Sequence, residues 1–308
     1  MMEGTVDSVL SDTIRNLAAS LGFDALGFAA ATEFEGYLLP QSVRRDPRLS
    51  LPEARTIIVA GLYIGGVVLP AWNEPGLGRT SRLYLSGFFN DIVKQLAPLA
   101  ALLRQAGYTA LICDDSEDNG SIVPLKLAAI RAGLGWQGKN SLLVTKKYGT
   151  FLALGGIVTN AGLGPLAEEE PNRCKSCTKC QDACPMKALA QPHVLNRARC
   201  LSYLLQHESF PEEAKAYTEN RVMDCEICQQ ACPWNAKHIA RPLATPLTAA
   251  FEKETPKWEA FFELSHLATL TEAEYETALG PLNIGIPFAI FRRNVGKARG
   301  ARQREERC

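Results

Sequence analysis

The sequence predicts an α+β protein of three successive parts, and three features of the chain predict it. Strand-like and helix-like segments alternate up to about residue 162, which is typical of a sheet packed against helices. Eight of the ten cysteines then fall within one stretch, 174–232. After about residue 240 the apolar residues return to helical spacing. We therefore expect domains at 1–162, 163–240 and 241–308.

The elements of the first part follow from periodicity and from glycine and proline. A helix is expected over residues 6–21, where apolar residues recur at helical spacing until Gly22. The β-branched run 54–61, bounded by proline and glycine, is expected to be a buried strand. Further strands are expected at 25–30, 108–113, 141–144 and 151–158, and further helices at 90–106, bent at Pro98, and at 123–132.

The cysteines have the spacing of an iron–sulfur protein. The first group, 174–185, reads C-x2-C-x2-C-x3-C-P, and the second, 225–233, lacks one cysteine, which Cys200 can replace. In two-cluster ferredoxins the cysteine before the proline binds the other cluster. We therefore expect one [4Fe–4S] cluster on Cys174, Cys177, Cys180 and Cys232, and a second on Cys200, Cys225, Cys228 and Cys184.

Other classes of protein fit the chain less well. Zinc sites use paired C-x2-C units without a terminal C-P, and disulfide-bonded scaffolds are short secreted chains. The formal net charge of +0 argues against a global field that would attract nucleic acid or membrane. The sequence has neither a signal peptide nor an apolar run of the ~20 residues that cross a bilayer. We therefore expect a cytoplasmic protein.

About 160 residues precede the clusters, so they are expected to supply a site for a cofactor or substrate. The candidate is the glycine-rich segment 133–140, because glycines let the backbone approach a ligand and a tryptophan offers a flat face. The first two glycines could equally form a helix cap and a turn, since the full dinucleotide fingerprint is missing. The candidate residues are Gly133, Gly135, Trp136, Gly138, Lys139 and Asn140.

Four segments together resemble the epoxyqueuosine reductase family: AGLGWQGKNSLL, CKSCTKCQDACPMKAL, NRARCLSYL and CEICQQACPWN. The resemblance covers roughly residues 5–300. This family carries out the last step of queuosine synthesis, removing the epoxide oxygen from a modified base in tRNA, and it is related to reductive dehalogenases. The resemblance implies a nitroreductase-like, cobalamin-binding α/β domain followed by a two-cluster bacterial-ferredoxin domain and a short helical C-terminal segment.

The resemblance also implies a mechanism. Electrons pass through both clusters to a Co(I) corrinoid, while an aspartate protonates the leaving oxygen; an apolar environment can raise a carboxyl pKa enough for this role. The family's Asp-Ser/Thr-x-Pro motif is not intact here, because Asp115-Ser116 lacks the proline. Asp115 is the first candidate for the acid and Asp118 the second. The acidic loop could also be merely solvated.

Two further departures bear on the substrate. Phe88 and Phe89 stand where the family carries a polar aromatic–histidine pair. The chain also ends at residue 308, where many members continue into helical repeats, so a short form of the family is expected. Tyr84 is expected to be a buried structural residue rather than a proton donor. The basic tail from Arg292 onward is expected to be a solvated, disordered terminus, although it could contact tRNA phosphates.

The leading hypothesis is a monomeric, cobalamin-dependent iron–sulfur oxidoreductase that reduces epoxyqueuosine in tRNA, without membrane attachment. Its electrons would come from a low-potential ferredoxin or flavodoxin. One alternative is a reductase of the same architecture that acts on an organohalide or an activated C–O bond. Another is an electron-transfer adaptor without corrinoid, whose first domain binds a partner protein.

Overall fold

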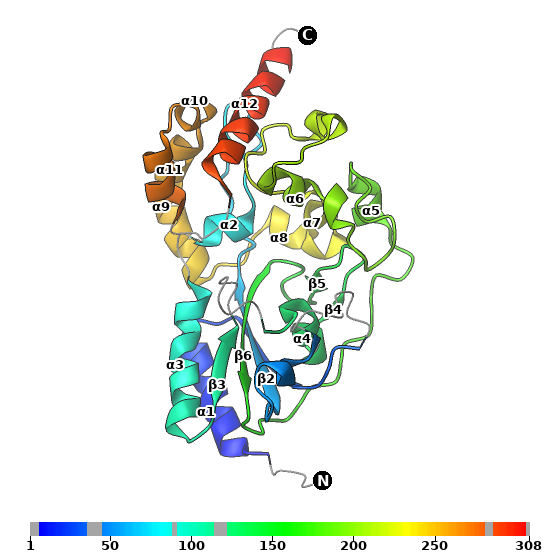
Figure 1. Cartoon of the computed structure of the whole chain (residues 1–308), viewed down its shortest axis with the longest axis vertical. Coiled ribbons are helices and arrows are strands. Elements are labelled where there is room, and N and C mark those ends of the chain that lie inside the picture. The colour runs from blue at the N-terminus through cyan, green and yellow to red at the C-terminus, as the bar shows by residue number, and fades with distance from the viewer. Residues whose placement is uncertain (1–5, 36–44, 88–90, 114–121, 281–285, 306–308) are drawn as a thin grey trace. The chain divides into compact units, whose positions relative to one another are not determined.

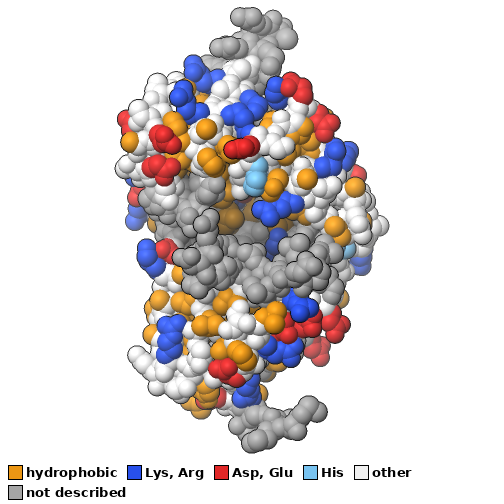
Figure 2. All heavy atoms as spheres, viewed as in Figure 1, with side chains coloured by type: hydrophobic (Ala, Val, Ile, Leu, Met, Phe, Trp, Pro, Cys, Tyr) orange, Lys and Arg blue, Asp and Glu red, His pale blue; other side chains and the backbone are white. Residues whose placement is uncertain are grey.

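The computed structural model describes residues 6–35, 45–87, 91–113, 122–280 and 286–305, with side chains to residue 300 (Figure 1). Contacts divide the chain into two compact units, which do not follow chain order. The first unit contains residues 1–63, 91–138 and 142–175, and the second contains 64–90, 139–141 and 176–308. The three domains expected from the sequence stay predictions, because a compact unit is defined by contacts and a domain by independent folding. Basic and acidic side chains are interspersed over the face drawn in Figure 2.

The first unit is built on a four-stranded antiparallel sheet with the strand order β1-β2-β6-β3. The strands are β1 (Ala25–Ala30), β2 (Thr56–Tyr63), β6 (Leu152–Thr159) and β3 (Ala110–Cys113). All eight residues of β2 are buried, because this strand lies inside the sheet and both of its faces are covered. The expected strands at 25–30, 54–61, 108–113 and 151–158 are thus present with shifts of up to two residues.

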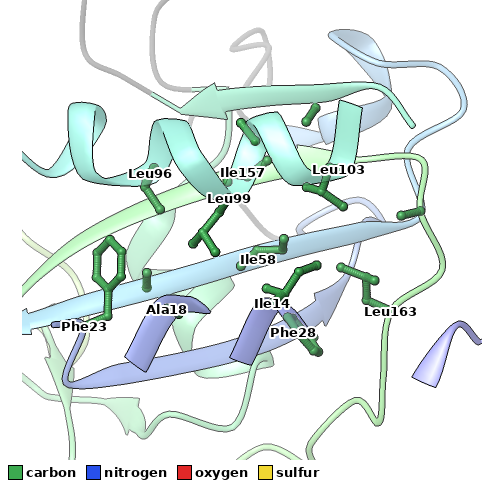
Figure 3. Close-up of a cluster of buried hydrophobic side chains, with 14 of the residues drawn as sticks. Ile14, Ala18, Phe23, Phe28, Ile58, Leu96, Leu99, Leu103, Ile157 and Leu163 are labelled. Carbon is green, nitrogen blue, oxygen red and sulfur yellow. The ribbon is translucent and has the colours of Figure 1, made fainter. Parts of the chain in front are cut away.

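Side chains alternate between the two faces of the sheet and form two cores. On one face Ile58 packs with residues of α1 (Ser8–Ser20) and α3 (Ile92–Gln105), as Figure 3 shows. On the other face its neighbour Ile57 packs with residues of α4 (Leu125–Arg131). Helices therefore cover both faces of this sheet.

Acidic side chains cap the two helices of the first core. Asp7 accepts a hydrogen bond from the Leu10 N–H at 2.9 Å and begins α1, and Asp91 accepts from the Lys94 N–H at 3.1 Å and begins α3. These caps satisfy N–H groups that have no partner inside the helix. Pro98 lies inside α3 as expected, and the bend expected there stays a prediction.

The second unit is helical. Short helices surround the cysteine motifs: α5 (Lys179–Ala183), α6 (Leu201–Gln206), α7 (Ile227–Gln230) and α8 (Ala236–Ala240). The remaining helices are α2 (Arg82–Gly87), α9 (Pro246–Phe262), α10 (Leu264–Leu267), α11 (Glu272–Leu279) and α12 (Phe288–Glu305). Trp258, Phe262 and Leu264 are buried, as their apolar spacing suggests, whereas Phe261 beside them is only partly buried. Within the described ranges, none of the helices has the length and apolar character needed to cross a membrane.

The basic tail corrects one part of an expectation, because its residues up to Glu305 form helix α12 rather than a disordered terminus, while Arg292 and Arg299 are exposed. Arg293 donates hydrogen bonds to the carbonyls of Leu204 and His207 at 3.1 and 2.7 Å, near the end of α6. Asn294 is fully buried and donates to the carbonyls of Leu205 and Val222. Carbonyls at a helix end have no partner inside the helix, so these side chains hold α12 against the end of α6.

Candidate cluster and cofactor site

The described cysteines of the second unit lie at helix termini. Helices α5 and α7, each of which carries one cysteine, pack against each other. Cys184 ends α5, Cys200 precedes α6, and Cys225 and Cys232 lie on either side of α7. The N-terminal ends of helices, near which Cys200 and Cys225 lie, leave backbone N–H groups available, and such donors suit thiolate ligands.

None of the described cysteines forms a disulfide bond, and the eight predicted ligands are partly buried. Burial raises the pKa of the Cys228 thiol well above its ordinary value, and four other thiols raise it further. These four are Cys225, Cys200, Cys180 and Cys184. Three of them, with Cys228 itself, make up the predicted ligand set of the second cluster.

Backbone N–H groups in the same region donate hydrogen bonds to cysteine sulfur atoms, and the buried thiols there would ionise only beside a positive charge such as that of iron. The Ala188 N–H donates to Cys184 Sγ at 3.3 Å, and backbone N–H groups of Ser202 and Tyr203 donate to Cys200. Burial raises the pKa of Cys225 to about 12, so that thiol needs a nearby positive charge to ionise. The donor set therefore fits an iron–sulfur cluster.

No group of three or more His, Cys, Asp or Glu side chains within the described ranges is arranged to hold a single metal ion. The cluster assignment does not require such a group, because the four thiolates of a [4Fe–4S] cluster bind four different irons and need not converge on one point. The full ligand assignment stays a prediction. Cys174 belongs to the first unit and the other seven ligands to the second.

The first two glycines of the glycine-rich segment lie in close contact with other parts of the first unit. Gly133 has φ +71 and ends α4, and a Cβ there would lie 2.5 Å from Ala167 Cβ. A Cβ on Gly135 would lie 2.1 Å from the carbonyl oxygen of Val144, because β4 (Trp136–Gln137) pairs with β5 (Leu143–Val144). Gly133 thus caps α4, and Gly135 lies where the Val144 carbonyl leaves no room for a side chain; whether either glycine also contacts a cofactor is not tested by this geometry.

Trp136 is only 1% exposed, so its ring offers no open face to a ligand. The Gly138 N–H donates to the carbonyl of Leu142 at 2.8 Å, and Asn140 is buried in the second unit. Lys139 is partly exposed, and its carbonyl accepts from the His193 N–H. These last three residues are the part of the segment we expect to contact a cofactor; the local geometry of Gly133, Gly135 and Trp136 does not itself indicate one.

The candidate acids Asp115 and Asp118 lie outside the described residues, as do Phe88 and Phe89. The structure instead reveals two acids that the sequence interpretation missed, Asp224 and Glu226, which flank Cys225. Burial raises the pKa of both carboxyls. The sequence did contain a signal: both acids adjoin a predicted cluster ligand in the run Asp-Cys-Glu-Ile-Cys. Acids at such a position are expected to be buried only with a partner, so a partner could have been sought.

Polar groups of the segment before and within α2 hold these acids. Asp224 accepts hydrogen bonds from the hydroxyls of Ser81 and Ser202, and Glu226 forms a buried ion pair with Arg82. Burial, and then the charge of Asp224, raise the pKa of Tyr84. Tyr84 itself is only partly buried, and its expected structural role stays a prediction.

A separate cavity of about 570 Å³ lies on α9, α10 and α11. Aromatic and basic side chains line it, including Trp258, Phe261, His266 and Lys257. None of the predicted site residues is among its lining residues, so the cavity is not the candidate site.

Comparison with known proteins supports this picture of the site. Residues 173–235 match the family described as 4Fe-4S double cluster binding domain. The epoxyqueuosine reductase of Gloeobacter violaceus is 32% identical over 314 residues, which cover 94% of this chain and 95% of that protein. The epoxyqueuosine reductase of Lactococcus garvieae is 35% identical over 232 residues, which cover 66% of this chain but only 63% of that protein.

Solved structures agree. An epoxyqueuosine reductase crystallised with an epoxyqueuosine-modified tRNA-Tyr stem loop superposes with a TM-score of 0.79 at 25% identity, covering 95% of this chain and 81% of that one. A reductive dehalogenase superposes with a TM-score of 0.53 at 18% identity over 85% of this chain and 38% of that one, which shows a shared fold alone. Sequence identity over nearly the whole length of the Gloeobacter protein, together with the double cluster domain, places the chain: it belongs to the epoxyqueuosine reductase family.

Proposed function

We propose that this protein reduces epoxyqueuosine to queuosine in tRNA. The observation that supports the proposal most is the 32% identity to the Gloeobacter violaceus epoxyqueuosine reductase along 95% of that protein. The reaction takes up two electrons and two protons and releases the epoxide oxygen as water, so the protein must deliver electrons and hold a proton donor beside the leaving oxygen.

As a member of this family the chain is an oxidoreductase whose cofactors are two [4Fe–4S] clusters and cobalamin. When bound, these groups supply single-electron transfer and a strongly reducing cobalt centre. The family assignment, more than the local geometry of residues 133–137, supports cobalamin. We expect Gly138, Lys139 and Asn140 to contact it.

The protein's own residues then have three tasks. Cys174, Cys177, Cys180 and Cys232 hold one cluster, and Cys184, Cys200, Cys225 and Cys228 hold the other. Backbone N–H groups that donate to Cys184 and Cys200 stabilise the thiolates. Asp115, or Asp118 in its place, protonates the leaving oxygen from its carboxyl group.

We further propose a monomer in the cytoplasm that receives electrons from a ferredoxin or flavodoxin and takes tRNA as its substrate. The chain has 33 basic and 33 acidic residues, so binding to tRNA would depend on local basic groups rather than on net charge. Affinity for the tRNA stem loop should fall steeply with salt, because each phosphate contact releases counterions.

Anaerobic reconstitution with iron, sulfide and hydroxocobalamin tests the proposal, followed by metal analysis and reaction with epoxyqueuosine-containing tRNA. We expect about eight irons and one cobalt per chain, and conversion of epoxyqueuosine to queuosine by nucleoside mass spectrometry. Full metal content without conversion would favour another substrate with an activated C–O or carbon–halogen bond. Eight irons without cobalt would favour the electron-transfer adaptor.

A further inference from the structure

A short segment of the second unit, distant in sequence from the cysteines, is bonded to the loop that carries Cys225. Residues 79–82, which we call the 79–82 strap, run alongside residues 220–226. The Arg79 N–H donates to the Asn220 carbonyl at 2.7 Å, and the Val222 N–H donates to the Arg79 carbonyl at 2.9 Å. These bonds form a parallel bridge between Arg79 and Arg221.

The strap then holds both acids that flank Cys225. The Ser81 hydroxyl donates to Asp224. The next residue, Arg82, binds both carboxylate oxygens of Glu226: its backbone N–H donates to Oε1 at 2.8 Å and its guanidinium donates to Oε2. Two consecutive residues therefore fix the chain on either side of a predicted cluster ligand.

The Arg82–Glu226 pair is deeply buried, with each side chain only 3% exposed. The guanidinium also donates to the Gly65 carbonyl at 3.0 Å and lies 4.9 Å from the centre of the Trp72 ring. Burying two charges costs solvation energy, and well-packed apolar residues often stabilise a protein as well as a buried ion pair does. A buried ion pair does, however, fix the relative position of the two chain segments that it links, because its donors and acceptors must match in direction.

In this protein the Arg82–Glu226 pair fixes the start of α7, within the second cysteine motif. Glu226 caps α7 with its backbone carbonyl, which accepts from the Gln229 and Gln230 N–H groups at 2.9 Å. Its side chain makes no cap bond, because Arg82 holds it elsewhere. The direction of the Glu226 side chain thus sets how α7, which carries Cys228, begins after Cys225.

We propose that Arg82 is a positioning residue for the second cluster, and that through Glu226 it holds Cys225 and Cys228 in the arrangement that ligates iron. The inference rests on the ligand assignment made under the proposed function. A loop ordered before the irons bind loses less conformational freedom on binding, so the cluster is retained more tightly. Ser81 has the same role for Asp224, with a weaker single hydrogen bond.

The test isolates one cluster at a time. Cys177→Ala should leave the second cluster alone, and Cys228→Ala should leave the first alone, each with about four irons after anaerobic reconstitution and desalting. Arg82→Lys is then added to both backgrounds, because lysine keeps the charge but cannot make the paired bonds of a guanidinium. Arg48→Lys is the matched control, since Arg48 pairs with Asp46 at an exposed site in the first unit.

With Cys177→Ala, we expect Arg82→Lys to lower the retained iron at least twofold and to shift the EPR spectrum and midpoint potential of the remaining cluster. With Cys228→Ala, Arg82→Lys should leave iron, spectrum and potential unchanged, as should Arg48→Lys in either background. Equal losses in both backgrounds would mean that Arg82 supports only the fold, and would overturn the proposal. Unchanged iron, spectrum and potential in the Cys177→Ala background would overturn it as well. If Cys228→Ala itself retains about eight irons, the ligand assignment fails instead.

Discussion

Substitution of Gly135 by alanine should destabilise the first unit strongly, although it adds a single methyl group. The added Cβ would lie 2.1 Å from the Val144 carbonyl oxygen and 2.9 Å from the Val144 carbonyl carbon. An ordinary carbon–oxygen contact is about 3.3 Å or longer. The backbones of β4 and β5 would therefore have to separate by about 1 Å, which breaks their pairing around Trp136.

The expected magnitude follows from this clash. Forcing an extra carbon into a packed site costs about 1–3 kcal/mol, and Val144 cannot relieve the contact by rotating a side chain because the atom is backbone. Gly296→Ala is the control, since Gly296 lies in α12 with nothing within 4 Å of an added Cβ. Alanine there should stabilise the helix by about 0.5–1 kcal/mol.

Anaerobic urea unfolding followed by tryptophan fluorescence measures both variants. A loss of about 2 kcal/mol moves the midpoint by roughly 1 M at an ordinary denaturant slope. The Gly135→Ala midpoint should fall by that amount with the slope unchanged, while the Gly296→Ala midpoint stays or rises. If the two variants unfold at the same urea concentration, the inference that Gly135 is required by contact with Val144 is wrong.

Three further outcomes are expected. Cys177→Ala should lose about four of eight irons and all turnover; unchanged iron content would contradict the ligand assignment. Asp115→Asn should keep cobalt and iron but lose conversion of epoxyqueuosine, because the amide cannot donate the proton, and full activity would point to another acid such as Asp118. Burial raises the pKa of Asp24, so the folded state disfavours its carboxylate and the free energy of unfolding falls as the pH rises through that pKa. Asp24→Asn keeps an acceptor for the Tyr63 N–H, which donates to Asp24 at 2.7 Å, and should flatten this fall; urea midpoints from pH 4 to 8 that stay as pH-dependent as in the wild type would contradict it.

The fold of the first unit could be predicted element by element, because its strands and helices have clear periodicity. The run 54–61 is apolar and β-branched enough to indicate a buried strand, which the structure places at Thr56–Tyr63. Strand order could not be predicted in the same way: β6 lies between β2 and β3, which precede it by many residues. Pairing between distant strands depends on which faces are covered, and local sequence does not contain that information.

The expectation of a disordered C-terminal tail was wrong for a similar reason. A run rich in arginine is interpreted as solvated and disordered when each charge is considered alone. Arg293 and Asn294 instead find carbonyls near the end of α6, almost 90 positions earlier in the chain. Whether such acceptors are within reach depends on tertiary packing.

The sequence by itself determined the cluster class, because the spacing of cysteines along a short chain segment limits which thiols can share a group of irons. It also indicated the family, through motifs that are contiguous in the chain. Only the tertiary structure decided that the Val144 carbonyl leaves no room for a side chain at Gly135, that Trp136 pairs with Val144, and that Arg82 reaches Glu226 across 144 residues. A local motif can be recognised from its spacing. The residues that hold it in place are distant in sequence, and only the tertiary fold brings them into contact with it.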